Sequence, residues 1–144
     1  MRDPSSGKSE IRKPDPVCVK STNLTRCQLD MSGPIDTFAN QYTGRRYEIE
    51  ISCPEFTSVC PKTGQPDFGE IRIVYEPAER CIELKSLKLY LQAYRSQGIF
   101  YEHVVNKILD DIVASCQPAR CRVIGNFRPR GGITTSVTAT FPSG

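Results

Sequence analysis

Four stretches with the character of strands constrain this fold more than any other feature of the sequence. Residues 46–51, 70–75 and 133–141 alternate polar and apolar side chains, and 122–127 is a further candidate strand. Alternation with a period of two is typical of a strand that has one buried face. The sequence therefore predicts one pair of strands in the middle of the chain and a second pair near its C-terminal end.

Two amphipathic helices are predicted between these pairs. Leu84, Leu87, Leu91 and Tyr94 recur at steps of three and four residues, which favours a helix ending near Gly98. A second helix, stopping before Pro118, has the same spacing of apolar residues: Val104, Val105, Ile108, Leu109, Ile112 and Val113. Residues 129–132 form the predicted turn between the last two strands.

The resulting order, β-β-α-α-β-β, indicates an α+β fold with an antiparallel sheet and both helices on one of its faces. The edge strands of such a sheet stay unpaired in a monomer. Joining sheets between subunits into a closed barrel would pair them. We therefore expect a homo-oligomer.

At 144 residues the chain is long enough for one ordinary domain. Residues 1–42 are rich in Pro, Ser, Asp and Lys, so we expect a partly disordered N-terminal arm followed by a single catalytic domain over 43–144. Neither a membrane-spanning apolar stretch nor a signal peptide is recognisable, which predicts a cytoplasmic protein.

Charge and cysteine content argue against several classes of protein. The net charge of +3 is mild, and the basic cluster Arg45-Arg46 lacks interleaved aromatic residues, so we do not expect direct nucleic-acid binding. The seven cysteines have no disulfide-scaffold spacing and should be mostly buried free thiols. Cys116 and Cys121 would need two more ligands to bind zinc, and the chain has one histidine, so we expect no metal site.

Cys60 and Asp67 are the first candidates for catalysis. They flank the turn-forming stretch 61–66, which can bring a thiol and a carboxyl group into one pocket, and Thr57 and Ser58 place hydroxyls nearby. A nucleophilic thiol needs its thiolate stabilised by local donors or positive charge. Asp67 would then act as a general acid–base group. The alternative for each residue is structural: a buried thiol and a turn aspartate.

Polar groups at the starts of both helices are the second set of candidates. Glu83, Lys85, Ser86 and Lys88 open the first helix. Glu102 stands where the second begins, beside the single histidine, His103. Such residues can simply stabilise helix ends. A glutamate in this place can also bind the ring N–H and exocyclic amine of a purine-like heterocycle.

Several of these segments resemble a known family. Residues 60–61, 64–68, 83–90 and 127–133 are closely similar to the short, single-module NADPH-dependent 7-cyano-7-deazaguanine reductases, the nitrile reductases of queuosine tRNA-modification biosynthesis. The resemblance runs from about Thr43 to Phe141, and Glu-Leu-Lys-Ser-x-Lys at 83–88 is the family's own signature. It implies the tunnelling fold, whose element order agrees with the periodicity, and two stacked pentameric rings.

The resemblance also implies roles for individual residues. Cys60 would add to the nitrile carbon of 7-cyano-7-deazaguanine to give a covalent thioimide, and Asp67 would supply protons to the nitrogen. The implied deazaguanine-binding residues are Ile82 and Leu84, through their backbones, with Glu83, Tyr101 and Glu102. The implied NADPH-binding residues are Lys85, Ser86, Arg130 and Gly131. Many members have a His-Glu pair where this chain has Tyr101-Glu102.

Three other functions are compatible with parts of the sequence. A relative of the same fold forms the same thioimide but accepts an amine in place of hydride, acting on modified archaeal tRNA. The intact signature at 83–88 argues against this amidinotransferase-type function. A zinc-dependent pterin-forming cyclohydrolase of this fold is disfavoured by the single histidine. A non-catalytic interaction module would leave all the cysteines inert.

Overall fold

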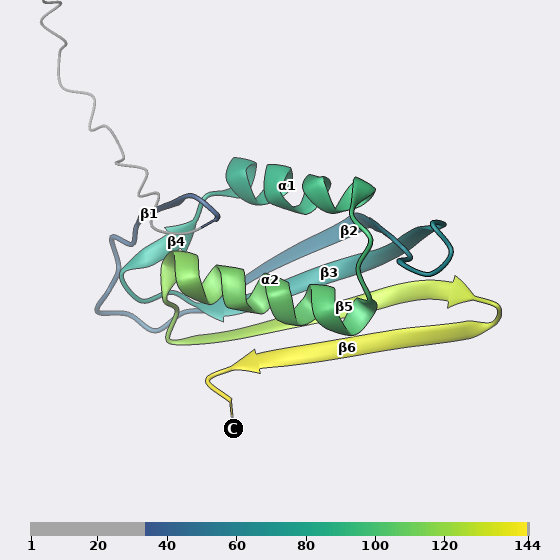
Figure 1. Cartoon of the computed structure of the whole chain (residues 1–144). Coiled ribbons are helices and arrows are strands. Elements are labelled where there is room, and N and C mark those ends of the chain that lie inside the picture. The colour runs from purple at the N-terminus through teal and green to yellow at the C-terminus, as the bar shows by residue number, and fades with distance from the viewer. Residues whose placement is uncertain (1–33, 144) are drawn as a thin grey trace, which may run out of the picture.

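The predicted order of strands and helices is confirmed in the computed structural model, which describes residues 34–143. A four-stranded antiparallel sheet has the order β2-β3-β5-β6. Both helices lie on one face of this sheet, α1 beside β2 and α2 over β5 and β6 (Figure 1). The strands of the sheet are β2 (Ile49–Val59), β3 (Pro66–Glu76), β5 (Arg120–Arg130) and β6 (Ile133–Phe141). The helices are α1 (Leu84–Gln92), a 3₁₀ turn (Ala93–Ser96) and α2 (Tyr101–Cys116).

A small second sheet was missed by the sequence prediction. It pairs β1 (Thr37–Ala39) with β4 (Arg80–Ile82) in antiparallel fashion. Ile35 and Thr37 are fully buried. The folded part therefore begins earlier than residue 43, where we placed the boundary, because β1 is too short to have a readable alternation. The predicted disorder of the arm falls largely on residues 1–33, which lie outside the described residues.

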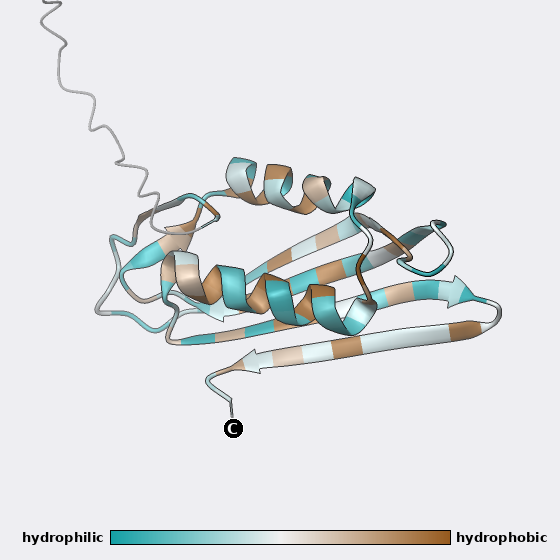
Figure 2. Ribbon diagram, viewed as in Figure 1, coloured by the Kyte–Doolittle hydropathy of each residue, from teal (hydrophilic) through white to brown (hydrophobic). Residues whose placement is uncertain are grey.

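The apolar stripes of both helices face the sheet, as Figure 2 shows from their hydropathy. Leu87, Leu91 and Tyr94 are buried as predicted, whereas Leu84 is 60% exposed. Leu84 is the first residue of α1, after the N-cap residue Glu83, and points away from the core although its spacing fits the stripe. Helix α2 ends before Pro118, with Gln117 in the left-handed conformation at φ 45°.

Two strands are longer than their sequence patterns. Strand β2 continues to Val59, far beyond residue 51, because a bulge between Cys53 and Phe56 interrupts the alternation around Pro54. Strand β5 continues to Arg130, so the predicted four-residue turn shrinks to Gly131 and Gly132, both at positive φ.

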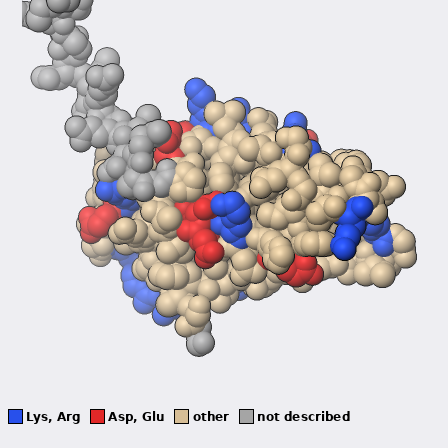
Figure 3. Space-filling model, in the orientation of Figure 1, with Lys and Arg blue, Asp and Glu red and all other residues tan. Residues whose placement is uncertain are grey.

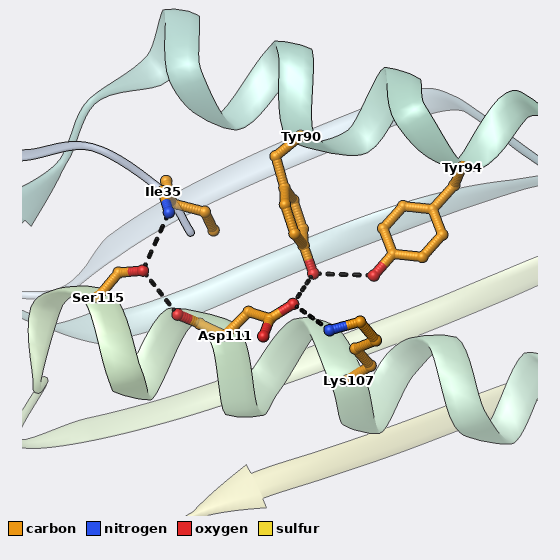
Figure 4. Close-up of polar contacts among 6 residues, drawn as sticks. All are labelled: Ile35, Tyr90, Tyr94, Lys107, Asp111 and Ser115. Atoms are coloured by element: carbon orange, nitrogen blue, oxygen red, sulfur yellow. Dashed lines mark hydrogen bonds and ion pairs between the residues drawn. The ribbon is translucent and has the colours of Figure 1, made fainter. Parts of the chain in front are cut away.

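A partly buried polar network joins the two helices to each other (Figure 4). The carboxylate of Asp111 accepts hydrogen bonds from the Tyr90 hydroxyl and from Lys107 Nζ, the latter at 2.9 Å. One turn later, Ser115 Oγ donates to the backbone oxygen of Asp111 (2.7 Å) and accepts from the Ile35 backbone N–H (3.1 Å). The network therefore also secures the segment that leads into β1.

The surface that carries the helices mixes acidic and basic side chains among uncharged ones (Figure 3). Over residues 34–143, neither helix is long and apolar enough to cross a membrane.

Gly125 sets how closely α2 can approach the sheet, and we expect Gly125→Ala to destabilise the protein. An added Cβ would lie 2.6 Å from Val105 Cγ2 and 2.9 Å from the Phe127 ring. Overpacking of this kind costs about 1–3 kcal/mol. Gly44→Ala is the control, since a Cβ there meets nothing within 4 Å. Urea unfolding of both variants measures the difference, and equal stabilities would contradict the close packing.

Candidate active site

Cys60 lies at the end of the β2–β3 hairpin, one residue beyond β2. Its backbone N–H donates to Gln65 O (2.8 Å), and its carbonyl accepts from Gly64 N (2.9 Å). Gly64 has φ 71°, a conformation that closes the turn readily only with glycine. The turn thus holds the thiol beside the first residues of β3, as the flanking of 61–66 by Cys60 and Asp67 predicts.

The surroundings of Cys60 favour its thiolate. Hydrogen bonds from the Thr63 hydroxyl and backbone N–H, then from Arg130 and the Lys62 backbone, lower the pKa of Cys60 to about 6, against the opposing effect of burial. A thiol with a pKa this low is largely ionised at neutral pH. In contrast, burial raises the pKa of Cys116 and of Cys121 to about 12. Cys60 is thus equipped as a nucleophile, while these two thiols are inert.

Asp67 lies on strand β3 and not in the loop where the sequence placed it. Its side chain is 5% exposed, and its Oδ1 accepts hydrogen bonds from Arg130 Nη2 and, at 2.7 Å, from the Tyr101 hydroxyl. Arg130 also hydrogen-bonds Cys60. The guanidinium therefore links the thiolate to the carboxylate, so the predicted pair is brought together through a third residue.

Tyr101, the first residue of α2, completes this group of side chains. Its ring stacks on Phe127 with centroids 3.8 Å apart and planes 9° from parallel. Burial, followed by the hydrogen bond to Asp67, raises the pKa of Tyr101 to about 12, so its hydroxyl remains a donor at neutral pH. Glu102 is exposed beside it. The sequence did not single out Phe127, because nothing in its pattern distinguishes a stacking partner from a core residue.

The predicted binding residues at positions 82–86 lie at the opposite end of the sheet. Ile82 N donates to Tyr75 Oη (3.0 Å), and Tyr75 pairs with Ile49, the first residue of β2. Cys60 follows Val59, the last residue of β2. Ten residue steps at about 3.3 Å each separate these two ends by roughly 33 Å. Within one chain, Ile82, Glu83, Leu84, Lys85 and Ser86 therefore do not share a pocket with Cys60.

In this structure Glu83 is engaged as the N-cap of α1. Its two carboxylate oxygens accept from Lys85 N (2.9 Å) and Ser86 N (2.7 Å), which lowers the pKa of Glu83. Each oxygen keeps a further lone pair for a ligand N–H. Ser86 Oγ accepts from Asp36 N at 2.9 Å. The cap thus holds the Glu83 side chain in one orientation before any ligand arrives.

The residues expected to bind NADPH have suitable chemistry. Lys85 is exposed, with exposed Lys88 one turn on, and Gly131 has open space around its Cα at the tip of the β5–β6 hairpin. Ammonium, guanidinium and backbone N–H groups are typical phosphate ligands. Among residues 34–143, no three His, Cys, Asp or Glu side chains are grouped as metal ligands.

We expect the pH dependence of Cys60 alkylation to report its lowered pKa. The rate of reaction with iodoacetamide, followed by mass spectrometry, should rise through pH 6 or so, because the thiolate reacts and the pKa is about 6. Thr63→Val should shift this transition towards the usual thiol value of about 8.5. Thr43→Val, at an exposed loop position, is the control. A transition near the usual value in the unsubstituted protein would contradict the thiolate environment.

Comparison with known proteins places this site in a family. The family model described as "QueF-like protein" matches residues 66–143. The NADPH-dependent 7-cyano-7-deazaguanine reductase of Chloroherpeton thalassium is 57% identical over 107 residues, covering 74% of this chain and 92% of the relative. The reductase of the same name from Rhodopirellula baltica is 53% identical over 108 residues, covering 75% of this chain and 89% of the relative.

A solved structure supports the fold. The crystal structure of the archaeosine synthase QueF-Like in the apo form superposes with a TM-score of 0.58 at 21% identity, covering 66% of this chain and 91% of that one. This likeness bears on the tunnelling fold alone, whereas the identities above 50% bear on the family. The chain belongs to the family of NADPH-dependent 7-cyano-7-deazaguanine reductases.

Proposed function

We propose that this protein reduces the nitrile of 7-cyano-7-deazaguanine to an aminomethyl group at the expense of NADPH, in queuosine biosynthesis. The observation that carries this proposal is the linked set Cys60–Arg130–Asp67. It combines a thiolate at neutral pH with a buried carboxyl group that can exchange protons. The close relatives bear the name of this reaction.

The first chemical step would use the Cys60 thiolate. Its sulfur adds to the electrophilic nitrile carbon while one C–N π bond breaks, and the nitrogen takes a proton from Asp67. The product is a neutral thioimide bound to Cys60 through a new C–S bond. Arg130 contributes to this step because its hydrogen bond helps to keep Cys60 in the ionised, nucleophilic form. Tyr101 keeps the Asp67 carboxyl group in place through its 2.7 Å hydrogen bond.

The later steps would release Cys60. NADPH supplies the hydrides, so that one nitrile, two NADPH and two protons give one aminomethyl group and two NADP⁺. After the carbon has received its first hydride, the C–S bond breaks and Cys60 leaves as a thiolate, which its low pKa favours. Asp67, which regains a proton from solvent after the first step, would donate the second proton to the nitrogen.

A complete site would need more than one copy of the chain. Glu83, Lys85 and Ser86 stand at one end of β2, and Cys60, Asp67 and Arg130 at the other, roughly 33 Å apart by the strand rise. A heterologous contact between subunits can bring the first end of one copy to the second end of the next. We propose that deazaguanine and NADPH bind at such interfaces in a homo-oligomer of stacked pentamers.

The two edge strands of the sheet could join neighbouring copies of the chain. Strands β2 and β6 are its edges, and β6 is largely exposed. Pairing β6 of one copy with β2 of the next would close the sheets into a barrel and remove both edges. We further propose a cytoplasmic location, where the free thiols stay reduced, and a free nucleobase as substrate without direct nucleic-acid binding.

We expect purified protein to oxidise two NADPH for each aminomethyl product formed from 7-cyano-7-deazaguanine. NADPH absorbance and product mass measure the ratio, and Cys60→Ala should abolish both signals because it removes the nucleophile. A nitrile adduct on Cys60 that yields product with ammonia but not with NADPH would instead identify an amine-accepting enzyme. With neither adduct nor oxidation, a non-catalytic role would replace the proposal.

Mixing inactive variants tests the shared site. The variants Cys60→Ala and Glu83→Gln should each be inactive alone but recover about a quarter of the wild-type activity when they are co-expressed. In a random mixture, about one interface in four pairs an intact Cys60 end from one copy with an intact Glu83 end from its neighbour. Glutamine retains an oxygen that can cap α1. The control pair, Cys60→Ala with Asp67→Asn, alters the same half and should stay inactive. Recovery by the control pair, or none by the test pair, would contradict a site divided in this way.

A further inference from the structure

Ser58 carries a hydroxyl whose position demands an explanation. Its side chain is fully buried, and among the described residues its Oγ is the buried side-chain polar atom without a hydrogen-bond partner in the protein. Burying an unpaired hydroxyl is unfavourable, because the group gives up its hydrogen bonds to water without replacing them. Alanine would fill almost the same space without this penalty. The hydroxyl therefore does not contribute to the stability of the free protein.

The register of the sheet places this hydroxyl among the catalytic groups. Ser58 on β2 is directly paired with Asp67 on β3, so the two side chains leave the same face of the sheet with Cβ atoms about 5 Å apart. Cys60, two residues further along, lies on that face as well. Ser58 thus carries the hydroxyl on β2 that is paired in register with Asp67, although no hydrogen bond joins the two side chains in the free protein.

In the free protein, the two side-chain partners of Asp67 are arranged for its ionised form. Arg130 is a donor without acceptor capacity, and the Tyr101 hydroxyl, which donates to the carboxylate here, can accept from the protonated acid only if it turns its own hydrogen elsewhere. Both stabilise the ionised carboxylate, as does the position of Arg130 between Asp67 and the Cys60 thiolate. A carboxyl group that delivers protons must also exist in the protonated form, and that form needs an acceptor. The lone pairs of Ser58 are free for this purpose.

We propose that Ser58 is a positioning residue for Asp67, accepting the hydrogen bond of the protonated carboxyl group when the contact with Arg130 is released. This role rests on the proposed reductase function. Ser58 holds the proton next to the thioimide nitrogen until that nitrogen takes it, after which Asp67 is ionised and returns to Arg130 and Tyr101. In the free protein, where Asp67 is ionised, the Ser58 hydroxyl therefore has no hydrogen-bond partner.

Ser58→Ala tests the proposal, with Ser115→Ala as the matched control at a buried serine whose hydroxyl is fully engaged. We expect Ser58→Ala to be at least as stable as wild type in urea and to lose about tenfold in kcat at neutral pH, the usual value of one hydrogen bond. Its decline in kcat with rising pH should begin at lower pH, because protonated Asp67 lacks its acceptor. Ser115→Ala should be less stable but keep the wild-type pH profile.

Ser58→Thr, which keeps a hydroxyl, should restore the pH profile. An unchanged kcat and pH profile in Ser58→Ala, beside active wild type, would overturn the role of Ser58 alone. A loss of stability in Ser58→Ala equal to that in Ser115→Ala would overturn it too, because the hydroxyl would then be bonded in the free protein. Wild-type protein without substrate-dependent NADPH oxidation would overturn the proposed function, and this role with it.

Discussion

The antiparallel register between β2 and β3 is the constraint on which the rest of the site depends. It sets Ser58 opposite Asp67 and Val59 opposite Pro66, so that the chain must turn at Cys60. A slip of one residue would send the carboxyl group to the other face of the sheet. The bulge between Cys53 and Phe56 shifts the register by one residue, so the positions of β2 that face the helices change from Ile51 and Cys53 before it to Phe56 and Ser58 after it. The pairing of these two strands therefore determines both the shape of the sheet and the relative positions of the side chains in the candidate site.

Electrostatics then acts on the groups that this register brings together. A buried thiol would ordinarily have a raised pKa, as Cys116 and Cys121 do. Around Cys60, the hydrogen-bond donors of Thr63 and Arg130 outweigh the effect of burial, so the pKa of this thiol is lowered and not raised. Arg130 reaches the site because β5 extends past its pairing with β3, which ends at Phe127. One arginine at the end of a hairpin thus joins two reactive groups from the neighbouring hairpin.

The sequence predicted the element order, the faces of both helices and the pair Cys60–Asp67, because these depend on periodicity and on local turns. It did not reveal β1 and β4, since strands of three residues have no measurable period. It also could not assign Arg130 to Cys60, because contacts across 70 residues depend on tertiary packing. The resemblance implied that Tyr101 binds deazaguanine, and in the free protein its ring stacks on Phe127 while its hydroxyl donates to Asp67. A contact between Tyr101 and deazaguanine stays a prediction.

The distance between the two ends of β2 has a consequence for the living cell. If neighbouring copies share each site, a correctly folded single chain holds half of the necessary groups at each of its ends and completes none. The enzymatic activity would then depend on the equilibrium between single chains and the assembly. On dilution of the protein, activity would fall more steeply than the protein concentration. An arrangement of this kind makes catalysis conditional on abundance, so that small changes in synthesis or degradation of the chain are amplified in the flux it supports.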